Sequence, residues 1–232
     1  MMETVDFLAF GAHPDDVEIG MGGTIAKHAV QGYRIAVCDL TEAEMSSNGT
    51  VETRRQEAAE ASAVLGLSHR SVLRLPDRGL TGSEEQLQAI VREIRRLRPR
   101  IVFAPYWDDR HPDHVACSRL IEEAVFNAKL RNYLPGVPPV QVEQLYYYFI
   151  NDSGNVSLIT DISDQIGTKL EALKAYRSQF APPAPGEDRV QTPLTDRYIQ
   201  RVEARDMLLG QTRGWAHAEG FAIRRPHAVT LF

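Results

Sequence analysis

The chain has 232 residues, of which 43% are hydrophobic and 25% are charged, as in a globular protein with a large buried core. Its 26 basic and 31 acidic side chains give a net charge of −5, which argues against a general nucleic-acid or membrane-surface binder. The two cysteines form no disulfide framework or thiolate zinc site. We expect one domain over residues 1–232. We expect cytoplasmic residence as the default, because we find neither a signal-peptide pattern nor about 20 consecutive apolar residues.

Short apolar strands alternate with helices in the first two thirds of the chain. The predicted strands are residues 5–12, 34–40, 71–75 and 101–104. The predicted helices are residues 23–31, 53–65, 84–97 and 115–130. Continuous apolar strands between amphipathic helices are typical of a parallel sheet that is covered on both faces. We therefore predict an α/β fold, Rossmann-like and doubly wound, with a mostly parallel sheet of order 3-2-1-4-5.

The last third of the chain is less regular and is predicted to form a C-terminal elaboration of the same domain. Its predicted elements are strands at residues 141–150 and 157–161, helices at 164–180 and 197–209, and short strand or coil from 215. Residues 181–193 are rich in proline, which predicts a surface loop. Earlier in the chain, the arginines between Arg95 and Arg100 are interpreted as a solvated helix end.

Two short motifs contain the candidate metal-binding and catalytic residues, and each motif follows a predicted strand. His13-Pro14-Asp15-Asp16 comes after the first strand, and His111-Pro112-Asp113-His114 comes after the fourth. Either motif alone is more often a turn with a capping carboxylate than a metal site. In the predicted sheet, however, strands one and four are neighbours, and ligands bind in the crevice at the carboxyl ends of such strands. We therefore expect the two motifs to meet at a metal ion.

The expected metal site takes its ligands from both motifs. His13, Asp16 and one histidine of the second motif make a set of two imidazoles and one carboxylate. Such a set leaves one coordination position open, which is typical of a catalytic zinc site rather than a structural one. Iron(II) accepts the same ligands, so the identity of the metal stays open.

Three other motif residues are candidates for catalysis. Asp15 stands next to a ligand, where a carboxylate can take a proton from the attacking water; a salt-bridged or capping aspartate is the structural alternative. We expect a protonated His111 to stabilise the developing oxyanion, with Asp113 holding its other ring nitrogen. The alternative role for Asp113 is the N-cap of the helix predicted from residue 115.

The two motifs resemble those of the PIG-L/LmbE-like family of metal-dependent N-acetylglucosamine deacetylases. The same resemblance extends over nearly the whole chain, in the stretches Glu18-Ile19-Gly20, Gly22-Gly23-Thr24, Asp39-Leu40-Thr41, Leu75-Pro76-Asp77, Asp109-Arg110-His111, Tyr176-Arg177-Ser178-Gln179-Phe180 and Ala218-Glu219-Gly220-Phe221. The chain is most similar to the bacillithiol-biosynthesis branch, which hydrolyses N-acetylglucosaminyl-malate to glucosaminyl-malate and acetate. The resemblance implies a homo-oligomer, such as a hexamer.

The resemblance also implies roles for individual residues: zinc ligands His13, Asp16 and His114, general base Asp15, oxyanion stabiliser His111, and substrate-facing or site-organising Arg54 and Arg110. On chemistry alone Arg54 is ambiguous. It either belongs to a solvated helix face or grips a malate carboxylate through a bidentate pair. Arg55, its neighbour, is the other candidate to point inward.

The chain departs from the bacillithiol branch at two places. Glu42-Ala43-Glu44 stands where that branch usually has Arg-Gly-Glu, and His217 stands where it usually has tyrosine. The first change removes a positive charge near the expected crevice, so the substrate stays open. One alternative is the same reaction on another N-acetyl sugar or a small amide. The other is a metal-dependent sugar-binding protein without catalysis, against which the presence of Asp15 argues, because binding alone needs no base.

Overall fold

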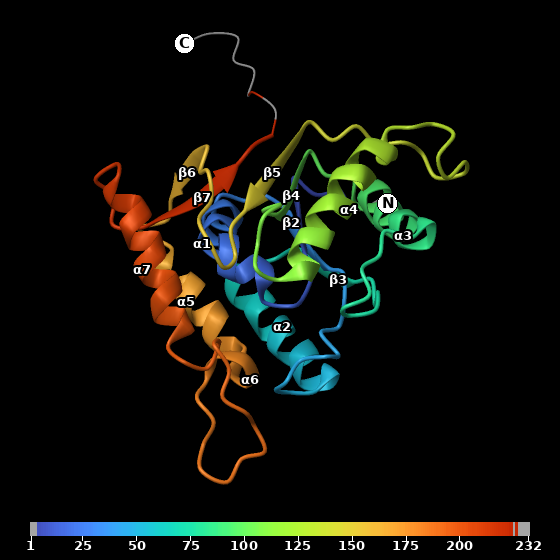
Figure 1. Ribbon diagram of the computed structural model, residues 1–232. Coiled ribbons are helices and arrows are strands. Elements are labelled where there is room, and N and C mark those ends of the chain that lie inside the picture. The colour runs from blue at the N-terminus through green and yellow to red at the C-terminus, as the bar shows by residue number, and fades with distance from the viewer. Residues whose placement is uncertain (1–3, 225, 227–232) are drawn as a thin grey trace.

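The computed structural model describes residues 4–224 and 226 of the chain (Figure 1). Its strands are β1 (Phe7–Gly11), β2 (Ile35–Asp39), β3 (His69–Val72), β4 (Ile101–Pro105), β5 (Gln144–Tyr148), β6 (Leu158–Asp161) and β7 (Ala218–Ala222). Its helices are α1 (Asp16–Val30), α2 (Val51–Leu65), α3 (Glu84–Leu97), α4 (Pro112–Ala128), α5 (Ile166–Ala175), α6 (Arg177–Phe180) and α7 (Tyr198–Gln211).

The described strands form one sheet of order β3-β2-β1-β4-β5-β7-β6. The first five pair in parallel, which confirms the predicted order 3-2-1-4-5. β7 pairs antiparallel with both β5 and β6, so the C-terminal elaboration extends the sheet at the β5 edge. β1 lies between β2 and β4, and its carboxyl end is therefore next to the carboxyl end of β4.

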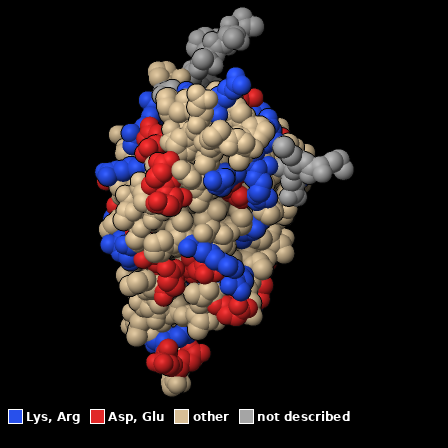
Figure 2. Space-filling model, turned by 90° about the vertical axis from the view of Figure 1, so that its right-hand side faces the viewer, with Lys and Arg blue, Asp and Glu red and all other residues tan. Residues whose placement is uncertain are grey.

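Helices cover both faces of the sheet. Successive residues of a strand point to opposite faces, so each buried strand contributes to two cores. Leu8 and Phe10 of β1 pack into one core with α3 and α4, and Phe7 and Ala9 pack into a second core with α1, α2 and α5 (Figure 1). None of the helices in the described part of the chain combines the length and the apolar character that a bilayer crossing requires. On the face shown in Figure 2, basic and acidic side chains lie close together, in keeping with the nearly balanced composition.

Two of the predicted helices differ most from the structure. α1 begins at Asp16, not at residue 23, and its backbone breaks at Met21 with φ −149° and ψ 22°. Gly20 lies at this break, and a Cβ there would stand 2.1 Å from the ring of Tyr148, so only glycine lets α1 approach β5 this closely. Gly20, which obscures the start of the helix in the sequence, is therefore a packing residue. The predicted helix 164–180 divides at Tyr176 into α5 and α6.

The break in α1 leaves backbone groups that need hydrogen-bond partners. The N–H groups of Gly23 and Thr24 donate to the two carboxylate oxygens of Glu219, at 2.9 and 2.6 Å. The carboxylate of Glu219 also pairs with the ammonium group of Lys169 at 2.7 Å, and both side chains are fully buried. Glu219 thus acts as an N-cap from another element and holds the second part of α1 in place.

Candidate active site

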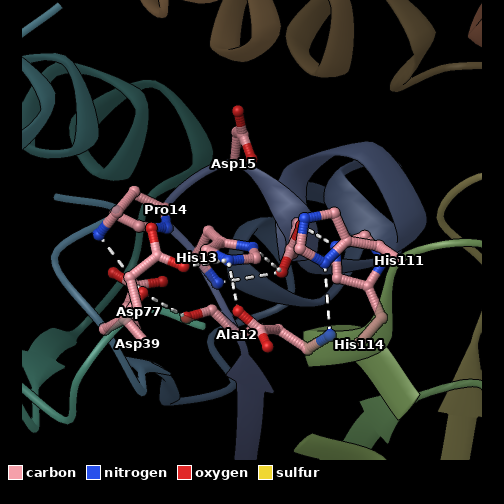
Figure 3. Close-up of polar contacts among 12 residues, drawn as sticks. Ala12, His13, Pro14, Asp15, Asp39, Asp77, His111 and His114 are labelled. Atoms are coloured by element: carbon pink, nitrogen blue, oxygen red, sulfur yellow. Dashed lines mark hydrogen bonds and ion pairs between the residues drawn. The ribbon is translucent and has the colours of Figure 1, made fainter. Parts of the chain in front are cut away.

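The two histidine motifs meet at the carboxyl ends of β1 and β4 (Figure 3). The ring centroids of His13 and His111 are 4.9 Å apart, those of His13 and His114 are 5.6 Å apart, and those of His111 and His114 are 4.7 Å apart. About a hundred residues separate the two motifs in the sequence. The sheet order brings them together, as expected from the adjacency of the first and fourth strands.

Asp16 lies between two of these imidazoles. Its Oδ1 is 3.1 Å from Nε2 of His114, and its Oδ2 is 3.4 Å from Nδ1 of His13. One nitrogen from each of His13, His111 and His114 also lies within 4.8 Å of the others. Imidazole nitrogen and carboxylate oxygen are donors that zinc and iron(II) accept, so the residues present fit a divalent metal at this point.

The charges of the cluster favour a cation at the same place. Burial opposes protonation of His114, but the carboxylates of Asp16 and Asp109 outweigh it and raise its pKa to about 9. Burial also opposes protonation of His13, whereas hydrogen bonds to Asp113, Asp16 and Asp77 raise its pKa well above the ordinary value. The imidazoles of His13 and His114 are thus surrounded by carboxylates that stabilise positive charge, and a metal ion can take the place of these protons.

Two carboxylates that the sequence analysis left without a role hold the histidines in orientation. Oδ1 of Asp109 lies 3.0 Å from Nδ1 of His114, and Oδ1 of Asp77 lies 3.3 Å from Nε2 of His13. Each histidine therefore points one ring nitrogen toward Asp16 and the other toward a supporting carboxylate, which is the usual arrangement around a metal-binding histidine. The stretches Leu75-Pro76-Asp77 and Asp109-Arg110-His111 contain both residues and were the available signal.

The carboxylates of Asp77 and Asp113 both lie beside Nε2 of His13. Nε2 of His13 is 3.5 Å from Oδ2 of Asp113, and His13, Asp77 and Asp113 could also hold an ion by distance alone. Nδ1 of His13 faces Asp16 on the opposite side of the ring. Because Asp77 and Asp113 meet only one side of His13, they fit better as the carboxylates that orient it than as a second metal site.

Asp113 occupies a different place from both of the expected ones. Its carboxylate accepts hydrogen bonds from the backbone N–H and from Nη1 of Arg78, each at 2.9 Å, and does not hold the ring of His111. Neither is it the N-cap of a helix, because α4 begins at Pro112 and His111 is the N-cap. Proline is well suited to the first helical position, where its missing N–H is not needed.

We expected a protonated His111, and its surroundings oppose that charge. Burial and the charges of His114 and His13 lower the pKa of His111. Its Nδ1 accepts a hydrogen bond from the backbone N–H of Asp113 at 3.2 Å. A neutral imidazole that accepts at Nδ1 carries its proton at Nε2, so His111 retains an N–H group to donate.

Asp15 is held by Arg54 in an unusual backbone conformation. Its φ is 101°, in the left-handed region, and its side chain is buried. Nη1 and Nη2 of Arg54 lie 3.1 and 3.2 Å from Oδ2 of Asp15, and Nη2 also donates to the carbonyl of Pro14. Burial raises the pKa of Asp15 to about 6 against the opposing charge of Arg54. A carboxyl group with this pKa is suited to exchanging protons near neutrality.

The two arginines of α2 face different ways. Arg54 is 2% exposed, lines the cavity beside Asp15 and lies with its guanidinium carbon 5.4 Å from the ring centroid of Tyr176. Arg55 is half exposed and pairs with Glu42 and Glu52. Arg54 is therefore the inward residue, and its hydrogen bonds go to Asp15 and Pro14, which makes it a residue that organises the site.

A cavity of about 400 Å³ opens above the histidines. Arg110, predicted to face the substrate, lines it together with Arg78. Two segments that are remote in sequence, residues 45–48 and residues 192–194, also line the cavity, and Met45, Ser47 and Pro193 among them are exposed. Buried reactive groups next to more exposed polar and apolar side chains are typical of a pocket for a small polar molecule.

Comparison with known proteins gives consistent matches over most of the chain. The family model PIG-L, described as GlcNAc-PI de-N-acetylase, matches residues 8–125. The diacetylchitobiose deacetylase of Thermococcus kodakarensis is 30% identical over 228 residues, which cover 92% of this chain and 80% of that protein.

Solved structures agree with this match. A conserved protein of Thermus thermophilus is 39% identical with a TM-score of 0.89, over 98% of both chains. The N,N'-diacetylchitobiose deacetylase of Pyrococcus horikoshii, in complex with an inhibitor, is 27% identical with a TM-score of 0.81, over 93% of this chain and 82% of that one. With its two histidine motifs converging as described, this chain belongs to the PIG-L family of GlcNAc-PI de-N-acetylases.

Proposed function

We propose that this protein removes the acetyl group from an N-acetylglucosamine-containing sugar by metal-dependent hydrolysis. The observation that carries the proposal is the position of the Asp16 carboxylate, 3.1 Å from His114 and 3.4 Å from His13, in a cavity that Asp15 and His111 also line. We assign the metal ligands to His13, Asp16 and His114. A zinc ion held there supplies Lewis acidity at the amide carbonyl and lowers the pKa of water; iron(II) is the alternative.

Asp15 is the group that we assign as general base. Water must lose a proton as it attacks the amide carbon, and a carboxylate with a pKa of about 6 is ionised at neutral pH yet basic enough to accept that proton. The same proton then passes to the departing nitrogen as the C–N bond breaks, which yields acetate and the free amino sugar. Arg54 fixes the carboxylate for both transfers through its hydrogen bonds to Oδ2.

His111 is the group that we assign to the oxyanion. The backbone N–H of Asp113 occupies Nδ1 of His111, so its Nε2–H is the group left to donate toward the cavity. A donor fixed in this way stabilises negative charge as it develops on the former carbonyl oxygen. The neutral imidazole needs no proton from solvent to play this part.

The volume of the cavity and the charged residues that line it indicate which substrates it can bind. A volume of about 400 Å³ lies in the range that drug-sized ligands fill, so there is room for more than an acetamido group. Two relatives are named for diacetylchitobiose, which supports an N-acetyl sugar of that kind. N-acetylglucosaminyl-malate is the second candidate, for which Arg110 is the cation at the cavity, since Arg54 is engaged with Asp15 and Arg78 with Asp113.

The decisive experiment combines elemental analysis with acetate release. Purified protein is expected to contain about one zinc or iron ion per chain and to release acetate from diacetylchitobiose, N-acetylglucosamine or N-acetylglucosaminyl-malate. His13→Ala and His114→Ala are expected to lose the metal and the activity, while His69→Ala, a histidine on β3 away from the site, retains both. Equilibrium binding of these sugars without acetate release would instead support the non-catalytic sugar-binding protein.

The homo-oligomer that the family resemblance implies, such as a hexamer, stays a prediction. Size-exclusion chromatography with light scattering measures the mass in solution directly. A mass of about 26 kDa, that of one chain, would contradict it.

A further inference from the structure

The side chain of Asn48 links two loops that line the cavity. Its Nδ2 donates to the carbonyl of Val190 at 2.9 Å, and its Oδ1 accepts from the N–H of Val190 at 2.8 Å. Both polar groups of one backbone residue are thus paired with one amide side chain. Asn48 is 4% exposed, whereas Val190 is 54% exposed, so Asn48 is the buried partner of this contact.

Asn48 is itself fixed to the body of the protein. Nε2 of Gln179 in α6 donates to the carbonyl of Asn48 at 2.8 Å. The next residue, Gly49, has φ +79°, and a Cβ at that position would stand 2.8 Å from Oγ of Ser178. Ser178 in turn donates from its backbone and hydroxyl groups to the carboxylate of Glu57 in α2, both at 2.7 Å. The Asn48 turn is therefore rigidly attached to α2 and α6.

The loop between α6 and α7 is held in place by its hydrogen bonds to Asn48. It projects beyond the end of α6 (Figure 1) and carries Val190 two residues before the cavity-lining segment 192–194. Within that segment the N–H of Thr192 donates to Oγ1 of Thr195 at 3.0 Å, and Oγ1 of Thr195 donates to the carbonyl of Thr192 at 3.0 Å. A turn closed in this way moves as one unit, so the bonds to Val190 also place Thr192 and its neighbours.

We propose that Asn48 is a positioning residue that holds residues 45–48 and 192–194 together as one outer wall of the cavity, and that this wall binds the part of the substrate beyond the acetylated sugar ring. The assignment rests on the proposed deacetylase function. The reacting groups stand at the ends of β1 and β4, so an acetamido group that reaches them leaves the rest of its sugar at the rim.

The composition of the wall suits a second sugar. Met45, Pro193 and Leu194 offer apolar surface for the face of a ring, while Ser46, Ser47 and Thr192 offer hydroxyl groups. The catalytic residues are held by other contacts: Asp15 by Arg54, and His114 by Asp109 and Asp16. Loosening the wall is therefore expected to weaken the binding of a disaccharide and to leave the chemical step little changed.

The experiment compares wild type, Asn48→Ala and Asn48→Asp in the full, metal-loaded chain. Asn48→Asp keeps the shape of the side chain but loses the donor to Val190, so it tests the contact without opening a cavity. For diacetylchitobiose we expect the KM to rise about tenfold in both variants, as for the loss of one or two hydrogen bonds, with kcat changed less than about twofold. Gln191→Ala, an exposed side chain of the same loop, is the matched control and is expected to match wild type.

Limited trypsin digestion gives a second measurement that needs no activity. The Arg189–Val190 peptide bond lies directly beside the groups that Asn48 binds, and a protease must free them before it cleaves. We expect cleavage after Arg189 to be about tenfold faster in both Asn48 variants.

The two measurements separate the possible failures. Unchanged cleavage, or an unchanged KM in an active enzyme, overturns the role of Asn48. Absence of acetate release from every sugar in wild type overturns the proposed function instead, and the digestion still decides whether Asn48 holds the loop.

Discussion

The guanidinium of Arg54 donates from both of its terminal nitrogens to the same oxygen of Asp15, at 3.1 and 3.2 Å. Asp15 sits in the left-handed backbone region with φ 101°, a conformation that costs free energy and persists only where neighbours hold it. Arg54 also donates to the carbonyl of Pro14, so it holds the side chain and the backbone of this turn together. The orientation of the proposed base is therefore set by a helix that contributes no metal ligand.

Replacing Arg54 tests this relationship. Arg54→Lys keeps the positive charge but loses the planar pair of donors, so the carboxylate of Asp15 becomes less well oriented. We expect kcat to fall about 10- to 100-fold while the metal content stays at the wild-type level. Arg55→Lys, the half-exposed neighbour, is the control and is expected to keep full activity. Equal kcat values in the two variants would show that Arg54 does not organise the site.

Asp15 itself is tested by Asp15→Asn. The amide has nearly the same shape but cannot accept a proton, so we expect turnover to fall about 10²-fold or more. Metal analysis is expected to show an unchanged stoichiometry, because the ligands that we assign are other residues. A variant that turns over at the wild-type rate would remove Asp15 from the mechanism.

Asp109→Asn tests the support of a proposed ligand. Oδ1 of Asp109 lies 3.0 Å from Nδ1 of His114, and loss of such an outer carboxylate typically weakens metal binding about 10- to 100-fold. The measurement is the metal dissociation constant by competition with a chelator. Asp108→Asn, exposed and adjacent in sequence, is expected to bind as wild type does. Equal affinities in the two variants would show that Asp109 does not support metal binding.

The substitution Lys169→Met tests the buried network of charged side chains at the break in α1. Its ammonium group is fully buried between Asp206, at 2.6 Å, and Glu219, at 2.7 Å. Lys169→Met leaves two buried carboxylates without their cation, which we expect to lower the free energy of unfolding by about 3–5 kcal/mol. Urea denaturation followed by circular dichroism measures it. Lys174→Met, on the exposed side of the same helix, is expected to differ little from wild type, and a similar small effect for Lys169→Met would refute the stabilising role of the network.

Glu93 gives a prediction for the dependence of stability on pH. Burial opposes its charge, but hydrogen bonds from Arg96 and Ser71 outweigh burial and lower the pKa of this carboxyl group. Since the folded pKa lies below the unfolded one, the folded state binds fewer protons. Its contribution is therefore present above about pH 4.5 and is lost as the pH falls through the folded pKa.

Glu93→Gln removes this contribution. We expect a lower melting temperature than wild type at pH 7 and a gap that closes as the pH falls below about 4. Glu123→Gln, an exposed glutamate of α4, serves as the control. A gap that stays constant from pH 7 to pH 3 would show that the ionised carboxylate does not contribute.

The order of the first five strands and the meeting of the two motifs could be predicted from the sequence pattern and the rules of the doubly wound fold. Apolar strands that alternate with amphipathic helices have few permitted arrangements, because crossovers between parallel strands are right-handed and ligands bind at the carboxyl ends. His13 and His114 therefore had to approach one another once strands one and four were neighbours. The motif residues are also local signals, visible in four consecutive letters each.

The side chains that support the motifs depend instead on how distant elements pack. Arg95 looks like part of a solvated helix end, yet it is 2% exposed, and its guanidinium donates to backbone carbonyls near the end of α4, among them those of Ala128 and Leu130. Arg54 reaches Asp15 from 39 residues away in sequence, and Glu219 caps α1 from 196 residues away. Such contacts leave no periodicity in the sequence, because each depends on where a whole element packs rather than on the residues beside it.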